Sequence, residues 1–202
     1  MKPVKIVACT AALMVAALLG GVAAQAVKKD EKPAKPPADA PAFQMPQPGP
    51  EHEILKKDVG VWDATVETSM EPGGQTMSSK GVETNKLLGS GLWLVSEFKG
   101  EFAGQPFEGR GISGYNPMKK KYVGCWVDSM STGLSLTEST YDPAKKTMTG
   151  SFEGPDESGK AVKMKTVSEW KDDGTRVFSM YMPTPDGKEF MGMRISYKRK
   201  AG

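Results

Sequence analysis

Polar and apolar residues alternate along most of the chain after residue 60, in short runs that turn residues separate. Alternation with a period of two is typical of β-strands that bury one face. The separators carry proline, glycine, asparagine and aspartate, which favour tight turns. We therefore expect ten strands, at residues 61–70, 76–84, 92–100, 107–115, 121–130, 134–142, 147–154, 161–171, 175–182 and 189–199.

The intervals between these strands are too short for helical crossovers, so consecutive strands should pair antiparallel. The expected fold is all-β, an up-and-down meander of about ten strands closed as a lipocalin-like barrel, because closure removes the exposed edges of the sheet. A bent open sheet or a β-sandwich is the alternative. Before the first strand, EHEILKKD at 51–58 predicts a short helix that caps the barrel.

Tight turns fix the register of three hairpins. The turn NPMKK at 116–120 pairs Gly111 with Trp126 and Gly109 with Asp128, and glycines opposite these larger residues leave room for them. We therefore expect Trp126 and Asp128 to face the barrel interior.

A turn centred on residues 142–145 pairs Leu136 with Phe152 and Glu138 with Gly150. Leucine and phenylalanine then share one face with Glu138, and this face should be the interior because it is the more apolar of the two. The expected interior therefore contains one carboxylate, Glu138, on an apolar wall that includes Phe152.

The third turn, with Asp186 and Gly187 at its centre, pairs Met182 with Met191 and Met180 with Met193. Four methionines on one face could bind Cu(I) through their thioethers. We prefer the interpretation that they pack a core wall or line an apolar pocket, because methionine is flexible and adapts to irregular spaces.

The N-terminal part of the chain has a different composition. Residues 1–26 combine a basic start, an apolar run and Ala24-Gln25-Ala26, which predicts a signal peptide cleaved near Ala26 and export to the periplasm or the extracellular space. A retained membrane anchor is the competing interpretation. Residues 27–50 hold seven of the fifteen prolines and predict a disordered linker. The folded domain should span residues 51–202, with no stable membrane insertion.

Charge and residue types exclude several functions. From residue 51 onward the chain has 21 basic and 21 acidic residues, so a nucleic-acid partner is not expected. The same region has one histidine, His52, and one cysteine, Cys125, too few for a closed zinc site or for a Ser-His-Asp triad unless His52 serves it. We expect His52 on the surface, no metal, no cofactor and no enzymatic activity. The oligomeric state is left open.

Several motifs together resemble a known family. They include the entry Glu51-His52 with Gly60-x-Trp62, FEGRGISGYNP at 107–117, KKKYVGCWVDSM at 119–130 and KTMTG at 146–150. In this combination the chain resembles the bacterial domain of unknown function 1579. The resemblance implies an exported protein with a lipocalin-like fold and no established activity.

The triplet Gly60-Val61-Trp62 also resembles the entry motif of lipocalins. That resemblance implies that Trp62 closes one end of the barrel and packs against a basic side chain of the last strand, Arg199 or Arg194.

The function expected from these observations is the binding of a small apolar or amphipathic molecule inside the barrel. Two alternatives stay open: a structural or interaction protein with a filled barrel, and an enzyme that uses the inward carboxylates. The expected ligand-binding residues are Trp126, Asp128, Glu138, Phe152, Met180 and Met193, and the expected plug consists of Gly60, Trp62 and Arg199.

Overall fold

The computed structural model describes residues 44–155 and 160–201. The expected signal peptide at 1–26 and most of the proline-rich segment, up to residue 43, lie outside the described residues. In the described part no helix is long and apolar enough to span a membrane.

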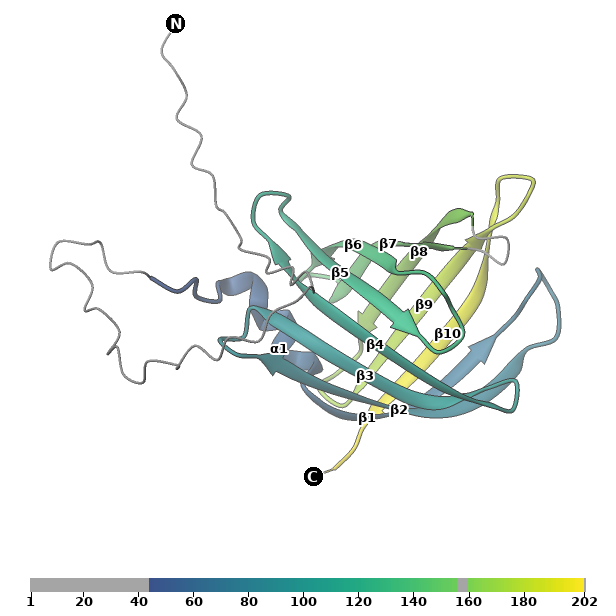
Figure 1. The fold of residues 1–202 in the computed structure, drawn as a ribbon, viewed down its shortest axis with the longest axis horizontal. Coiled ribbons are helices and arrows are strands. Elements are labelled where there is room, and N and C mark those ends of the chain that lie inside the picture. The colour runs from purple at the N-terminus through teal and green to yellow at the C-terminus, as the bar shows by residue number, and fades with distance from the viewer. Residues whose placement is uncertain (1–43, 156–159, 202) are drawn as a thin grey trace, which may run out of the picture. The chain divides into compact units, whose positions relative to one another are not determined.

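A single-turn 3-10 helix leads into one short α-helix, and ten strands follow (Figure 1). The elements are η1 (Pro50–His52), α1 (Glu53–Asp58), β1 (Gly60–Thr68), β2 (Met77–Leu88), β3 (Trp93–Phe102), β4 (Gln105–Asn116), β5 (Lys121–Asp128), β6 (Ser135–Asp142), β7 (Thr147–Pro155), β8 (Ala161–Trp170), β9 (Thr175–Pro183) and β10 (Glu189–Arg199).

Each strand pairs antiparallel with its neighbours in the sequence, and β1 also pairs with β10. This last pairing closes the sheet into a barrel, so the expected up-and-down barrel is confirmed. The open sheet and the sandwich are excluded because each would leave two edge strands unpaired.

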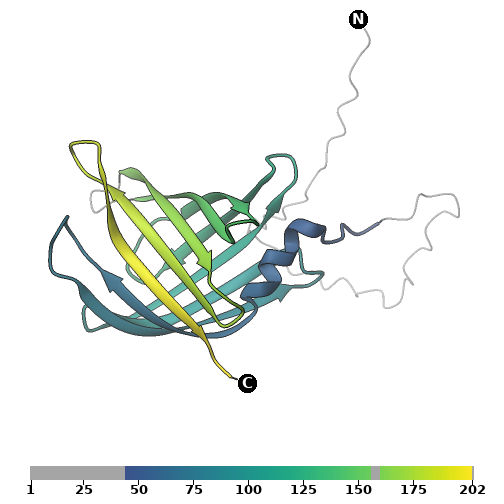
Figure 2. The same ribbon diagram turned by 180° about the vertical axis from the view of Figure 1, so that it is seen from behind.

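Helix α1 lies across one end of the barrel (Figure 2). Its residues Ile54 and Leu55 are buried against Leu94, Tyr122 and Trp170, which come from three different strands. The Tyr122 hydroxyl also donates a 2.7 Å hydrogen bond to a backbone carbonyl of η1. The helix is therefore held as a cap over the barrel end by both apolar burial and a hydrogen bond.

The β4–β5 hairpin has the register expected from its turn: Gly111 pairs with Trp126 and Gly109 with Asp128. A Cβ atom on Gly109 would overlap the Trp126 ring. The glycines are thus required because the indole lies directly against the backbone of β4.

The predicted register of the β6–β7 hairpin is wrong by one residue. Asp142 pairs with Thr147 across a four-residue loop, whose last residue, Lys146, has a φ of 51°. The β4–β5 loop has the same construction, with Lys120 at a φ of 52°. Lysine in this left-handed conformation adds one residue to the loop, and a shift of one residue exchanges the two faces of a strand.

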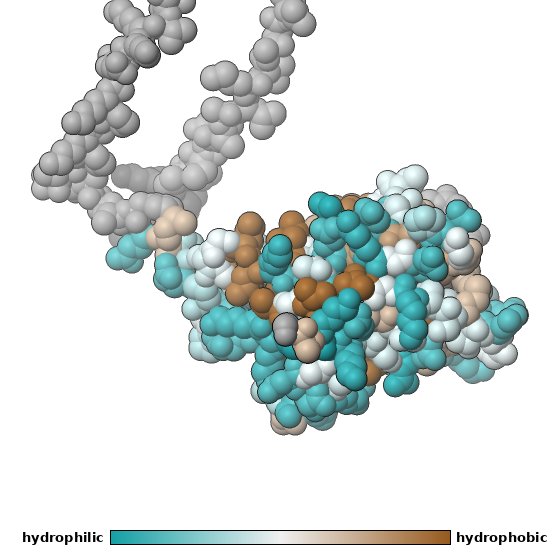
Figure 3. All heavy atoms as spheres, turned by 90° about the horizontal axis from the view of Figure 1, so that it is seen from below, coloured by the Kyte–Doolittle hydropathy of each residue, from teal (hydrophilic) through white to brown (hydrophobic). Residues whose placement is uncertain are grey.

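The expected interior face of β6 is therefore the outer face. Leu134 and Leu136 are 57% and 54% exposed, and Thr137 and Ser139 face inward instead. One view of the molecular surface shows apolar side chains, in brown, gathered among hydrophilic ones (Figure 3). The exterior of this barrel is thus less polar than expected for strands that bury their apolar face and expose their polar face.

The β9–β10 hairpin confirms the pairing of Met180 with Met193 but not that of Met182 with Met191. The register shifts at Gly192, where a Cβ atom would overlap the Met182 side chain. This β-bulge turns Met191 outward, opposite Tyr181, and leaves it 42% exposed. The four methionines do not form one face.

One side of the barrel interior is filled by side chains. Trp62, Ala64 and Val66 of β1 pack with Phe98 of β3 and Tyr197 of β10 in a buried cluster. The interior along the remaining strands contains the cavity described next.

Candidate ligand-binding cavity

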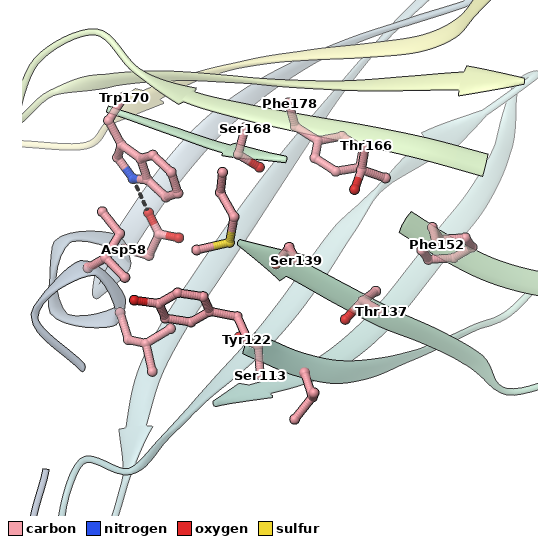
Figure 4. A pocket seen from close by; sticks show the side chains of 14 residues that line it. Asp58, Ser113, Tyr122, Thr137, Ser139, Phe152, Thr166, Ser168, Trp170 and Phe178 are labelled. Atoms are coloured by element: carbon pink, nitrogen blue, oxygen red, sulfur yellow. Dashed lines mark hydrogen bonds between the residues drawn. The ribbon is translucent and has the colours of Figure 1, made fainter. Parts of the chain in front are cut away.

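A cavity of about 210 Å³ lies inside the barrel below α1 (Figure 4). Its lining comes from α1 and from strands β4 to β9. Side chains from seven elements thus meet around one space, and two chemical types dominate the wall.

The first type is a set of small hydroxyl groups on alternating strand positions. The set consists of five serine and threonine side chains, and none of them has a hydrogen-bond partner in the described part of the chain. Polar groups in a protein interior normally have partners, so these hydroxyls are available to water or to a ligand. They belong to Ser113, Thr137, Ser139, Thr166 and Ser168.

The second type is apolar. Met148, Phe152 and Phe178 line the strand walls, and Ile54 and Leu55 of α1 form the covered end. A cavity with both types of wall can hold a molecule that has an apolar body and polar substituents.

Asp58, the last residue of α1, places a carboxyl group at the covered end of the cavity. Its Oδ1 accepts a 2.8 Å hydrogen bond from the Trp170 indole and lies 3.5 Å from the Nε of Arg176. Burial raises the pKa of Asp58 above its ordinary value of 3.8, although Arg176 and the Trp170 hydrogen bond act in the opposite direction.

A network of buried polar groups continues from Asp58 toward β1, β2 and β10. The Glu83 carboxylate accepts hydrogen bonds from Arg176, from the Asn85 amide at 2.7 Å and from the Tyr197 hydroxyl at 2.8 Å. The Arg176 guanidinium also stacks 3.8 Å from the centre of the Tyr197 ring. Glu83, Asn85, Arg176 and Tyr197 are all buried, so this network is an interior feature of the barrel.

The network is only partly satisfied. Burial acts against the positive charge of Arg176, but Asp58 and Glu83 outweigh it and raise the pKa of the guanidinium. Burial and the nearby Glu83 charge raise the pKa of Tyr197. In the described region, Oδ1 of Asn85 and Nε of Arg176 are buried without a hydrogen bond.

The residues expected to bind a ligand are dispersed. Phe152 lines the cavity. Trp126 and Met193 pack instead against the buried cluster around Trp62, and Met180 is the cross-strand partner of Met193. Of the six residues proposed from sequence, Phe152 alone is among those that line this cavity.

Asp128 holds a loop. Its Oδ2 accepts a 3.1 Å hydrogen bond from the Trp126 indole, and its Oδ1 accepts bonds from the backbone of Met130 and from the backbone and hydroxyl of Ser131. The carboxylate thus fixes the turn after β5, away from the cavity.

The expected inward orientation of Glu138 is wrong. The β6 register directs Glu138 outward, where Lys119 and Lys121 form ion pairs with it. Hydrogen bonds from these two lysines lower the pKa of Glu138 to about 2. Glu138 therefore forms ion pairs with two lysines on the surface, and surface ion pairs contribute little to stability.

Trp62 is 1% exposed, and the Arg199 guanidinium lies 4.1 Å from the centre of its ring. Arg199 also donates hydrogen bonds to the carbonyls of Lys57, Val59 and Asp173. Gly60 has a φ of 126°, and a Cβ atom there would lie 2.7 Å from Arg199. The contact implied by the entry motif is therefore present, and Arg199 ties α1 to the end of β10.

His52 is buried rather than exposed, with 7% of its surface accessible. Its Nδ1 lies 3.0 Å from the backbone nitrogen of Gly49, which donates to it, and its ring meets the edge of Tyr115. The histidine therefore fixes the start of the helical cap.

Sequence reasoning missed Asp58, the hydroxyl groups and the buried network. The hydroxyls lie on strands where serine and threonine alternate with apolar residues, as in Ser135, Thr137 and Ser139 beside Leu134 and Leu136. This alternation is a local signal, but the rule that the polar face of a strand meets solvent places these hydroxyls outside the barrel. The separation of Glu83 from Arg176 by 93 residues left no local signal for their contact.

The closed barrel with a short helical cap places the chain in the class of antiparallel up-and-down β-barrel proteins. Within that class it belongs to the family described as "Protein of unknown function (DUF1579)", whose model matches residues 47–199. No curated protein matches the chain.

Several solved structures share the fold, and two of them are similar to this chain as follows. The crystal structure of Rv2717c from M. tuberculosis is similar with a TM-score of 0.57 and 10% identity, over 76% of this chain and 99% of that one. The S-type phycobiliprotein lyase CPES from Guillardia theta is similar with a TM-score of 0.51 and 10% identity, over 75% and 93% of the two chains. At this identity the likeness concerns the fold.

Proposed function

We propose that this protein is an exported, non-catalytic binding protein that holds a small amphipathic molecule in the cavity below α1. The observation that carries the proposal is the wall of five hydroxyl groups that have no hydrogen-bond partner among the described residues and that face Met148, Phe152 and Phe178. A cavity used only for packing would be lined by apolar groups, because unpaired polar groups in an interior cost free energy.

The volume limits the size of the molecule. A cavity of about 150 Å³ is sufficient to bind benzene, so about 210 Å³ suits a single ring, or a branched aliphatic group of similar size, with one polar substituent. The cavity also favours a binding protein over the alternative of a completely filled barrel.

Export is supported by the sequence of residues 1–26, with its apolar run and Ala-Gln-Ala site. The proposal that the protein is not an enzyme is supported by the use of His52, which holds the backbone of Gly49.

Calorimetric titration with benzyl alcohol tests the binding function. We expect saturable binding of one molecule per chain. In Thr137→Leu the longer side chain enters the cavity, and the affinity should fall about tenfold or more.

Thr140→Leu is the matched control, since Thr140 lies on the same strand but is exposed, and its affinity should equal that of the wild type. Absence of binding, or equal losses in the two variants, would contradict an interior site.

A further inference from the structure

One oxygen of the Asp58 carboxyl group is free to contact a ligand. Asp58 is the one charged residue among the described residues that line the cavity. Its Oδ1 accepts the Trp170 hydrogen bond and is the atom nearest to Arg176. No hydrogen bond from the described part of the chain reaches Oδ2, and Figure 4 shows this second oxygen directed into the space beside Tyr122 and Trp170.

The charges around Asp58 do not balance. Asp58 and Glu83 are two carboxyl groups, and Arg176 is the one buried guanidinium that contacts them among the described residues. The guanidinium of Arg176 is shared, because its Nη2 bonds Glu83 while its Nε faces Asp58 without a hydrogen bond. With both carboxyl groups ionised, this part of the interior has one negative charge in excess.

Arg199 compensates this charge only from a distance. Its three nitrogen atoms donate to the backbone carbonyls of Asp173, Val59 and Lys57 at the rim of the barrel. A buried negative charge without a close partner is costly. A cationic group at Oδ2 would therefore bind favourably.

We infer that the cavity selects a primary amine, whose ammonium group binds Oδ2 of Asp58 and whose compact apolar body packs among Met148, Phe152 and Phe178. This inference depends on the proposed binding function and adds the chemical class of the ligand. An ammonium group has three hydrogen-bond donors. The hydroxyls of the same wall, such as Ser139 and Ser168, have no partner among the described residues and can accept those that Asp58 does not.

The opposite charge does not fit this site. A carboxylate ligand would face Asp58 directly, with Glu83 behind it, and like charges in a low-dielectric interior repel strongly. A neutral alcohol fits the shape and the hydroxyl wall but gains no ionic interaction. The three head groups should therefore bind in the order amine, alcohol, carboxylate.

Benzylamine, benzyl alcohol and benzoate present these head groups on the same ring, and calorimetric titration of the whole chain at neutral pH compares them. We expect benzylamine to bind about tenfold tighter than benzyl alcohol, because its hydrogen bond to the carboxylate is charge-assisted. Benzoate should bind more weakly than the alcohol.

Asp58→Asn removes the charge and keeps an oxygen that accepts the Trp170 hydrogen bond. In this variant the advantage of the amine should disappear, so that benzylamine and benzyl alcohol bind with about equal affinity. Glu138→Gln is the matched control, because this carboxylate lies outside the barrel, and it should leave all three affinities unchanged.

The outcomes separate the two proposals. If benzyl alcohol binds and benzylamine binds no better, the amine inference is wrong and the binding function stands. If no probe binds, both are wrong. Should Asp58→Asn fail to fold, the ranking of the three probes on the wild-type protein decides the inference alone.

Discussion

At the scale of single residues, Arg176 is the centre of the buried network. It contacts Asp58, Glu83 and the rings of Tyr197 and Trp62. One side chain thus connects the end of α1 with β1, β2 and β10. The network links the helical cap to the filled side of the barrel.

Replacement of Arg176 by methionine should lower the free energy of unfolding by about 3 to 5 kcal/mol, because it leaves two buried carboxyl groups without their cation. Urea unfolding monitored by tryptophan fluorescence measures this change. Arg194→Met is the control, since Arg194 is exposed on β10, and its effect should stay within about 0.5 kcal/mol. Equal effects of the two substitutions would show that the network contributes no stability.

The raised pKa of Asp58 predicts a pH dependence of stability. The folded protein binds the Asp58 proton more tightly than the unfolded chain, whose aspartate has the ordinary pKa of 3.8. Protonation therefore favours folding, and the Asp58 contribution to stability should decrease as pH rises from 3.8 through the raised pKa. Asp58→Asn lacks this titration.

Unfolding of both proteins across this pH range gives the comparison. The wild-type free energy of unfolding minus that of Asp58→Asn should decrease with increasing pH. A difference that grows with pH would mean that Arg176, rather than burial, determines the pKa of Asp58.

At the scale of elements, strand β6 has an inverted pattern. Leu134, before its first residue, and Leu136 face solvent, whereas Thr137 and Ser139 face the cavity. The rule that the apolar face of a strand is buried assumes a packed interior. Here the interior is hollow and polar on this side, so the rule gives the wrong face.

Cysteine labelling tests the inverted face. In a background with Cys9 and Cys125 replaced by serine, Leu136→Cys should react rapidly with a bulky thiol reagent, and Thr137→Cys should react much more slowly because it points into the barrel. Unfolded protein provides the reference rate for each variant. Faster reaction at position 137 than at 136 would refute the register.

The sequence was sufficient to predict the elements and their order, because alternation and turn residues are local signals. The register of β4–β5 followed from the turn at residues 116–120, and it places Gly109 and Gly111 where they leave room for Trp126. The predicted register of β6–β7 was wrong because the left-handed conformation of Lys146 is set by the loop and is not a preference of lysine. The contacts of Asp58 with Trp170 and Arg176 could not be predicted, since they depend on how the barrel closes.

At the scale of the whole molecule, the barrel interior has two parts with different roles. The part along β1, β3 and β10 is packed around Trp62, Phe98 and Tyr197. The part along β4 to β9 contains the cavity, with α1 covering its end. A packed side that provides stability allows the other side to contain a cavity.

We propose that the cavity below α1 is the ligand site. A crystal structure of the protein with 4-bromobenzylamine tests it most directly, because anomalous scattering locates the bromine without any assumption about the site. We predict the bromine between Phe152 and Phe178 and the amine within hydrogen-bonding distance of Asp58. Bromine bound only on the outside of the barrel, with the cavity closed by the protein's own side chains, would contradict an interior ligand site.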